Sequence, residues 1–481
     1  MLLSLYRVAM ALGRPLLLRK LRRRGEQEPL YLHAVHQRFA EYTDEEVQAA
    51  RAHAGEWVWL HAVSLGETRA SAVLIEALRA AMPGMRLLLT NGTATGWQEG
   101  EKLLQPGDMH VWLPWDSRAA TRRFVETFRP RLGLLMETEI WPEMLAACDA
   151  AGIPVVLANA RMSEKTLRQS LRFESLARKI YGLLRVAYAQ TADDAERLLR
   201  LGVRDIRVTG NLKFDARPDP QQLESGRQLR AARDAALRSA GQAATPVVML
   251  ASSREGEEKL WIEALAGLPQ QQRTAVQWLL VPRHPQRFDE VAAMLEQAGW
   301  NVSRRSAWGI HAGAANELHV ASAQDGGAPA VWLGDSMGEM VFYYALADLT
   351  LMGGSFEPLG GQNLIEACAC GCPVLLGPHT FNFAEASEQA IGVGAALRCG
   401  DMADAVQTAL GLVGAGASVH GVEVPAVGAE ASAIGADQAA ASGNKLSAMR
   451  SAALLFSQQH QGAAQRIVQD IHALGWLSTR R

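Results

Sequence analysis

GGSFEPLGGQNLIEACACGCPVLLGPHTFNF, residues 353–383, is the stretch that decides the fold. The apolar run 346–352 before it predicts a buried strand, and residues 363–370 predict a helix that leads into a second strand over 373–376. Glycines let the backbone approach a phosphate, and the N–H groups at a helix start attract its charge. The stretch therefore predicts an anion-binding strand–loop–helix–strand unit, in which Glu366 is placed to accept hydrogen bonds from ribose hydroxyls. A Gly-rich turn without a ligand is the alternative.

The loop in this stretch matches neither of two common nucleotide-binding patterns. It lacks the G-x-x-x-x-G-K-[ST] of a P-loop and the G-x-G-x-x-G of a dinucleotide fold. Its pair Gly360-Gly361 nevertheless stands just before the expected helix, where glycine permits close approach to a phosphate. ATP hydrolysis and dinucleotide binding are therefore not the first expectation.

Length, charge and cysteine content limit the class of protein. The 481 residues suffice for two large α/β lobes, each with its own core. A formal net charge of −2 provides no general basic field, so we do not expect a nucleic-acid partner. Cys368, Cys370 and Cys372 have a spacing that fits no common zinc site. We expect them to be small buried residues, with no metal and no cofactor.

Residues 1–24 combine apolar residues with seven cations and no acid. A cleavable signal peptide would carry its charges first, and a spanning helix would need about 20 residues with few charges. We expect an amphipathic segment that lies on an anionic membrane face, a plain cationic surface helix being the alternative. The apolar residues expected to enter the membrane are Leu2, Leu3, Leu5, Val8, Met10 and Leu12.

In the first lobe, polar residues repeatedly follow short apolar runs. Buried strands are expected at 57–62, 85–90, 109–113, 132–136 and 155–157. In a parallel sheet the residues after the strands share the carboxyl edge, where ligands bind. Glu67 lies there at a helix start, as a candidate general base or, alternatively, a helix cap. Glu137 and Glu139 are candidates for positioning a hydroxylated substrate, the alternative being a polar strand end.

The second lobe repeats the opening of the first. A strand, a loop ending in Gly-Glu and an amphipathic helix recur about 190 residues later, as two Rossmann-like halves would give. Ser252 and Ser253 precede the second of these helices and are candidates for presenting hydroxyl and N–H groups to a phosphate. Arg283 and His284 stand between two prolines after a strand and predict a rigid cationic corner for a carboxylate or phosphate. Each motif also occurs in turns without a ligand.

The remaining segments complete a four-part organisation. Lys213 lies at the lobe junction, where a cation can reach a ligand, a solvated lysine being the alternative. Residues 309–328 and 411–443 are rich in Ala, Gly and Ser and predict long surface loops or disorder, and residues 446–477 predict a closing helix. The expected parts are a membrane-associated segment, an acceptor domain, a donor domain with its insert and a final helix, with bounds 1–24, 25–215, 216–445 and 446–481.

Nine motifs in chain order resemble the bacterial 3-deoxy-D-manno-octulosonic acid (Kdo) transferases of lipopolysaccharide biosynthesis. They are HAVSLGE, LPWDS, METEIWP, NARMSEK, GNLKFD, ASSREGEE, LVPRHPQRF, GDSMGEM and GGSFEPLGGQNLIEA with GCPVLLGPHTFNF. The resemblance covers about residues 1–405. It implies a GT-B fold of two Rossmann-like domains facing a central cleft, CMP-Kdo as donor and a lipid A precursor as acceptor. It also implies inverting, metal-independent transfer on the cytoplasmic face of the bacterial inner membrane, with peripheral or N-terminally anchored attachment.

The resemblance also implies roles for individual residues. Glu67 matches the proposed catalytic base, and Glu137 and Glu139 fall in the acidic motif on the acceptor side. On the donor side it implies roles for Lys213, Arg283, Met337, Asn363 and Glu366. With them we count the candidates from the local patterns, which are Ser252, Ser253, His284, Gly360 and Gly361. The family usually has His at Gln362, Thr at Ser253 and Ser336, and Asn at Glu143, so we assign Gln362 no role in proton transfer.

Two other functions fit the same sequence. A GT-B enzyme that uses a UDP-sugar, or a nucleotide-sugar epimerase, would have the same fold. A membrane-associated nucleotide-binding scaffold is the second, although it gives no reason for an acidic base opposite a donor loop. Binding of CMP-Kdo rather than a UDP-sugar separates these alternatives.

Overall fold

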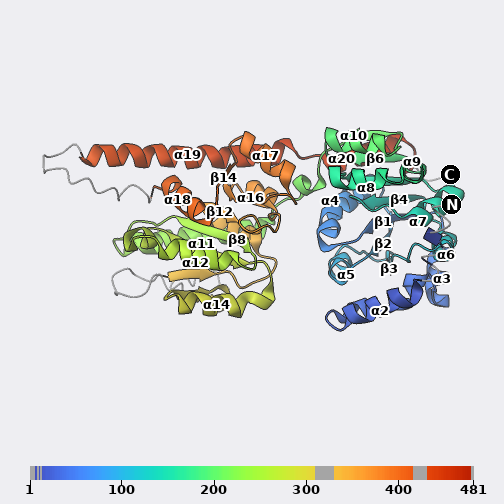
Figure 1. Ribbon diagram of the computed structural model, residues 1–481, viewed down its shortest axis with the longest axis horizontal. Helices are drawn as coiled ribbons and strands as arrows, with labels where there is room; N and C mark the ends of the chain where they lie inside the picture. Colours follow the sequence, from blue (N-terminus) through green and yellow to red (C-terminus); the bar gives the residue numbers. More distant parts are fainter. Residues whose placement is uncertain (1–5, 8–9, 11–12, 309–329, 415–430, 478–481) are drawn as a thin grey trace. The chain divides into compact units, whose positions relative to one another are not determined.

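The computed structural model describes residues 6–7, 10, 13–308, 330–414 and 431–477, with the backbone alone for 431–444. The chain forms two compact units (Figure 1). Unit 1 contains residues Met1–Ala216 and His460–Arg481, and unit 2 contains Arg217–Gln459. The predicted insert 309–328 lies outside the described residues.

Unit 1 is built on a seven-stranded parallel sheet in the order β3-β2-β1-β4-β5-β6-β7. Its strands are β1 (Trp57–Ala62), β2 (Arg86–Asn91), β3 (Met109–Trp112), β4 (Leu132–Met136), β5 (Val155–Ala160), β6 (Val186–Ala189) and β7 (Ile206–Val208). The central strands β1 and β4 are apolar except for His61 and are buried on both faces, as parallel sheets covered by helices require. The expected strands of the first lobe are confirmed.

Helices cover both faces of the unit 1 sheet. They are α2 (Arg14–Gly25), η1 (Pro29–Leu32), η2 (Val35–Phe39), α3 (Asp44–Ala52), α4 (Leu65–Ala81), α5 (Ala94–Glu101), α6 (Arg118–Phe128), α7 (Pro142–Ala150), α8 (Glu164–Leu171), α9 (Glu174–Tyr181), α10 (Ala192–Arg200), η3 (Leu212–Asp215) and α20 (Ala463–Ala473). One face packs against α6, α7, α9 and α10, and the other against α4 and α20.

Unit 2 has a second seven-stranded parallel sheet, in the order β10-β11-β9-β8-β12-β13-β14. Its strands are β8 (Val247–Ser253), β9 (Gln277–Pro282), β10 (Asn301–Arg304), β11 (Ala330–Leu333), β12 (Leu349–Met352), β13 (Val374–Leu376) and β14 (Ala396–Arg398). Its helices are α11 (Pro220–Ser239), α12 (Glu257–Ala266), α13 (Gln270–Thr274), η4 (Pro285–Arg287), α14 (Phe288–Gln297), η5 (Arg305–Ala307), α15 (Met340–Leu346), α16 (Leu364–Ala369), α17 (Ala384–Gly392), α18 (Met402–Leu412) and α19 (Ala431–Gln459). The prediction of two Rossmann-like parallel domains is confirmed.

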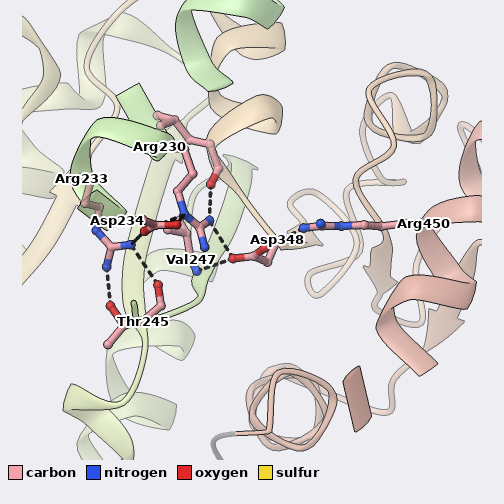
Figure 2. Close-up of polar contacts among 8 residues, drawn as sticks. Arg230, Arg233, Asp234, Thr245, Val247, Asp348 and Arg450 are labelled. Atoms are coloured by element: carbon pink, nitrogen blue, oxygen red, sulfur yellow. Dashed lines mark hydrogen bonds and ion pairs between the residues drawn. The ribbon is translucent and has the colours of Figure 1, made fainter. Parts of the chain in front are cut away.

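A charged network joins three elements of unit 2 at the amino edge of its sheet (Figure 2). Asp348, just before β12, accepts a hydrogen bond from the backbone N–H of Val247 at 2.9 Å. The same carboxylate pairs with Arg230 of α11 at 2.7 Å and with Arg450 of α19 at 2.6 Å. Because one carboxylate serves both helices and the start of β8, it fixes their position on the sheet.

Two expectations for the C-terminal third are wrong. The segment 411–443 is not one long loop, since α18 extends to Leu412 and α19 begins at Ala431, while 415–430 lie outside the described residues. The single helix expected over 446–477 is two helices, because the chain turns at Gly462 with φ of 94°. Asp215 holds this turn by accepting hydrogen bonds from the N–H groups of Gly462 and Ala464. The chain thereby returns to unit 1, where α20 packs beside α4.

The N-terminal segment is described only in part. Five of the six residues expected to enter a membrane lie outside the described residues, and the sixth, Met10, is helical and partly exposed. Within the described part of the chain, no helix combines the length and apolar character that crossing a bilayer requires. The packing role expected for the cysteines is confirmed for Cys368 and Cys372, which are buried.

Candidate functional site

In each sheet the strand order reverses at one point, and several of the predicted site residues stand at the carboxyl ends of the strands that flank it. In unit 1 the chain runs outward on one side from β1 and on the other from β4, and in unit 2 from β8 and β12. Open α/β sheets bind ligands at the carboxyl ends of the strands that flank such a switch point. Glu67 follows β1 and Glu137 follows β4, whereas Ser253 is the last residue of β8 and the Gly-rich loop follows β12.

Glu67 lies in the first turn of α4, and its carboxylate folds back over the helix start. Ser64 is the N-cap, and its hydroxyl accepts the N–H of Glu67 at 3.4 Å. The Glu67 carboxylate accepts the N–H of Val63 at 2.6 Å and the Ser64 hydroxyl at 3.2 Å. This is the capping geometry given as the alternative to a base. Capping fixes where the carboxylate points, and a fixed position is also what a general base requires.

The surroundings of Glu67 favour a proton acceptor over a mere cap. Burial raises the pKa of the Glu67 carboxyl, the hydrogen bond from Val63 acts in the opposite direction, and the negative charge of Glu137 raises it further. Burial together with the charge of Glu67 raises the pKa of Glu139 to about 7. Unit 1 therefore brings Glu67, Glu137 and Glu139 together as one acidic group, with raised pKa values for Glu67 and Glu139, and such values are typical of functional carboxylates.

Lys213 joins this acidic group from η3. Its Nζ lies 3.2 Å from the carboxylate of Glu137. Asn159 holds the start of η3, because its side-chain oxygen accepts the N–H of Leu212 at 2.9 Å. Glu137 and Asn159 have φ values of 52° and 53°, a left-handed conformation that costs energy and is concentrated at functional sites. The structure thus places Lys213 with the residues expected on the acceptor side.

The charge of Glu137 gives a prediction for pH dependence. We expect Glu137→Gln to shift the acid limb of kcat/KM to lower pH. The reason is that the substitution removes a negative charge that raises the Glu67 pKa and leaves the Lys213 cation nearby. If Glu67 is the base, only its ionised form is active. Activity would then be lost as pH falls through the Glu67 pKa, and a lower pKa would move that loss to lower pH. The measurement is a pH–rate profile of both proteins.

Glu126→Gln is the matched control for that profile. Glu126 lies on α6 with a half-exposed side chain paired to Arg122, so the profile of this variant should follow that of the unchanged protein. An acid limb that stays in place or moves to higher pH in Glu137→Gln would contradict the coupling of Glu137 to the base.

In unit 2, the predicted donor residues after β8 and β9 form one corner. The backbone N–H of Arg283 donates to the carbonyl of Ser253 at 2.9 Å, which joins the two loops. Ser252 has a φ of 53° at an irregularity of β8. Burial lowers the pKa of His284, and the charges of Arg254 and Arg283 lower it further. Cations thus gather at this corner, as expected for a site that binds a phosphate or carboxylate.

The Gly-rich loop differs from the expected phosphate cradle in its first part. The N–H groups of Gly354 and Phe356 donate to the carboxylate of Glu257, at 2.6 and 3.0 Å. A carboxylate of the chain itself therefore takes these two donors. In the second part, Gly360 and Gly361 have φ values of 93° and 79°, which only glycine adopts without strain, and they lead to α16.

Asn363 and Glu366 lie at the start of α16 as predicted. Asn363 is the N-cap residue, and its side-chain oxygen is buried with no hydrogen-bond partner among the described residues. A buried acceptor without a partner is costly, and a bound ligand that donates a hydrogen bond would relieve that cost. Glu366 lies in the first turn of this six-residue helix. Met337 follows β11 with 54% of its side chain exposed.

Residues 334–338, Gly-Asp-Ser-Met-Gly, match the G-x-S-x-G pattern of serine hydrolases. The hydroxyl of Ser336 contacts the carboxylate of Glu339 and the hydroxyl of Tyr343, both at 2.5 Å. In the Ser-His-Asp arrangement a histidine accepts the proton of the serine, whereas the partners of Ser336 are a carboxylate and a tyrosine hydroxyl. The motif match therefore does not indicate hydrolysis.

Sequence reasoning did not assign roles to Glu143 and Asp116, which hold the start of α7. Asp116 is buried and accepts the N–H groups of Glu143 and Met144 at 3.0 and 2.9 Å. The N-terminal segment reaches the same place, where Tyr6 donates to Asp116 at 2.8 Å and Arg7 pairs with Glu143 at 2.7 Å. The helix α7 directly follows the loop that carries Glu137 and Glu139. By holding the start of α7, the N-terminal segment therefore also helps to position that loop.

Comparisons with known proteins identify relatives of this chain. Residues 33–216 match the family model described as 3-Deoxy-D-manno-octulosonic-acid transferase (kdotransferase). The chain is 47% identical over 365 residues to a 3-deoxy-D-manno-octulosonic acid transferase of Bordetella pertussis, covering 74% of this chain and 79% of the relative. It is 30% identical over 355 residues to the transferase of that name from Haemophilus influenzae, covering 73% and 78%. A glycosyltransferase structure from Rickettsia africae covers 89% of this chain and 100% of its own, with a TM-score of 0.51 at 11% identity, which is a likeness of fold.

Proposed function

The chain belongs to the family of 3-deoxy-D-manno-octulosonic acid (Kdo) transferases, and from this premise we propose that it moves Kdo from CMP-Kdo to a lipid A precursor with inversion. The observation that carries the proposal is the acidic group of unit 1. A partly buried, capped carboxylate with a raised pKa at a sheet switch point is suited to take a proton from an acceptor hydroxyl.

In the proposed reaction, Glu67 takes the proton of the acceptor hydroxyl as its oxygen attacks the anomeric carbon of Kdo. The bond between that carbon and the phosphate oxygen breaks, and CMP leaves with the electron pair. Glu137 and Glu139 position the acceptor, and Lys213 moderates the charge of Glu137. Fixed charges and N–H groups stabilise a developing anion without having to reorganise. The cationic corner of unit 2 is therefore suited to stabilise the negative charge that develops on the leaving phosphate.

We assign donor binding to the switch point of unit 2. The cations of Arg254 and Arg283, which face His284, support phosphate binding, and the unpartnered side-chain oxygen of Asn363 supports a ligand that donates a hydrogen bond. Glu366 is suited to accept hydrogen bonds from ribose hydroxyls. The remaining proposed donor residues are Ser252, Ser253, Met337, Gly360 and Gly361.

We assign an anionic membrane surface to the N-terminal segment. In α2, the side chains of Arg22, Arg23 and Arg24 are exposed, and Leu16 is 70% exposed. Cations beside exposed apolar side chains suit the phosphates and acyl chains at a lipid surface. The proposed location is the cytoplasmic face of the bacterial inner membrane, where CMP-Kdo and the lipid acceptor meet.

The choice of nucleotide tests the proposal against its rivals. Isothermal titration calorimetry should show that the chain binds CMP-Kdo and CMP, with no comparable binding of UDP-glucose or UDP-N-acetylglucosamine. Tight binding of a UDP-sugar with no response to CMP would overturn the proposal in favour of another GT-B enzyme. Binding of CMP-Kdo without transfer to any lipid A precursor would favour a scaffold.

A further inference from the structure

Glu257 is a fully buried carboxylate at the first position of α12, and its oxygens take three backbone donors. The N–H groups of Gly354 and Arg254 donate to one oxygen at 2.6 and 2.9 Å, and that of Phe356 donates to the other at 3.0 Å. Two of these donors belong to the Gly-rich loop after β12. The carboxylate thus sits in a cup of N–H groups of the kind that binds anions in other proteins.

Glu257 occupies the same place in unit 2 that Glu67 occupies in unit 1. Each glutamate follows a glycine in the loop after the first strand of its unit and lies in the first turn of the next helix. Among the described residues, those that donate hydrogen bonds to Glu67 are close to it in sequence, and Glu67 faces the like charge of Glu137. Glu257 instead reaches the loop after the neighbouring strand. The shared position therefore serves two tasks: the Glu67 carboxylate is bound only near the start of its own helix and lies beside a second acid, whereas the Glu257 carboxylate holds a neighbouring loop.

The path of the Gly-rich loop depends on this carboxylate. Without this carboxylate, the buried N–H groups of Gly354 and Phe356 would lose their acceptor. Each N–H group would then cost the free energy of one lost buried hydrogen bond. The carbonyl of Gly354 in turn accepts the N–H of Gly361 at 2.6 Å. A chain of contacts therefore runs from Glu257 through Gly354 to Gly361, two residues before Asn363.

The Gly-rich loop also packs tightly against the end of β8. A Cβ added at Gly353 would lie 2.5 Å from the carbonyl oxygen of Ser252, so only glycine fits there. A shift of the Gly-rich loop would consequently disturb Ser252 as well as the residues that lead to α16. One buried carboxylate is thus in a position to fix both loops of the switch point.

We propose that Glu257 is a positioning residue that acts as a built-in anion, fixing the Gly-rich loop so that Asn363 and Glu366 meet the donor. This inference rests on the proposed donor site. It also means that the donor phosphate is not held by the N–H groups of Gly354 and Phe356, which are already used, and that phosphate binding is left to the remaining groups of the site.

The test is Glu257→Ala in the full chain, with and without acetate, which replaces the atoms that the substitution removes. Amide hydrogen exchange at Gly354 and Phe356 should accelerate, and acetate should slow it again. The Kd for CMP-Kdo should rise by about 10- to 100-fold and recover several-fold in acetate, with the KM of the lipid acceptor within about twofold of the unchanged protein. A purely structural role would not produce recovery by acetate.

Glu255→Ala is the matched control, because Glu255 lies in the same loop with an exposed side chain. It should change neither exchange nor donor affinity. Unchanged exchange in Glu257→Ala, or faster exchange with a donor Kd within about twofold of the unchanged protein, would overturn the inference. If the alanine variant does not fold, Glu257→Asp takes its place, and a folded aspartate variant with unchanged exchange and donor affinity overturns it equally.

The exchange and binding measurements also separate this inference from the proposed function. If the unchanged protein does not bind CMP-Kdo, the proposed function fails while the exchange data still decide whether Glu257 holds the loop. If the unchanged protein binds CMP-Kdo and Glu257→Ala binds it equally well, the inference alone fails.

Discussion

Glu67→Gln should reduce Kdo transfer by about 10²- to 10⁴-fold, the contribution that a positioned general base makes. The amide oxygen of glutamine can still accept the N–H of Val63, so the start of α4 should keep its conformation. What the amide lacks is an oxygen basic enough to take a proton from the acceptor hydroxyl. Initial rates with a saturating lipid acceptor measure the loss.

Two observations accompany the expected loss in Glu67→Gln. The Kd for CMP-Kdo should stay within about twofold of the unchanged protein, because the donor residues proposed in unit 2 are untouched. Glu126→Gln, at a half-exposed position of α6, should keep its full rate. A rate in Glu67→Gln above about a tenth of the unchanged value would contradict the assignment of the base.

Arg7→Met should loosen the start of α7 by about 2 kcal/mol, measured as the opening free energy from amide exchange at Glu143 and Met144. The side chain of Glu143 is 2% exposed and that of Arg7 is 34% exposed. Removing Arg7 leaves a buried carboxylate without its cation, which costs 3–5 kcal/mol in a closed interior and less where water reaches one partner. Because α7 follows Glu139, transfer should fall as well.

A second substitution tests whether the ion pair causes that effect. Glu143→Asn replaces the carboxylate by an uncharged amide, so no charge remains to be compensated. In this background, Arg7→Met should cost less than about 0.5 kcal/mol, and the difference is the coupling free energy of the pair. Arg14→Met removes an arginine from the exposed pair with Glu41 and should have little effect. Equal costs of Arg7→Met in both backgrounds would show that the pair does not act as described.

Local sequence patterns were sufficient for the strands and for the edge at which the site lies. Trp57–Ala62 and Leu132–Met136 are strands with the bounds expected, because a continuous apolar run between turn residues has few other stable conformations in an α/β protein. The parallel arrangement then brings the residues after these strands to one edge. Glu67 and Glu137 are near each other for this reason, as their electrostatic coupling shows.

Contacts between distant segments could not be read from local patterns. The carboxylate of Glu257 and the N–H of Gly354 are 97 positions apart, and Arg7 and Glu143 are 136 apart. Such partners are chosen by the tertiary fold, so the loop glycines alone suggested an open phosphate cradle. The repeated Gly-Glu of the two lobes was the one available signal for Glu257. The return of the C-terminal helix to unit 1 likewise depends on Asp215, whose partners lie 247 and 249 positions away.

Mass spectrometry of a lipid A precursor incubated with the full chain and CMP-Kdo tests the central claim most directly. Each transferred Kdo adds a fixed mass, so the products can be counted from the spectrum. The account predicts at least one Kdo addition with release of CMP, and no product when UDP-sugars replace CMP-Kdo or when Glu67→Gln replaces the unchanged protein. An unmodified precursor after incubation with a folded chain that binds CMP-Kdo would contradict it.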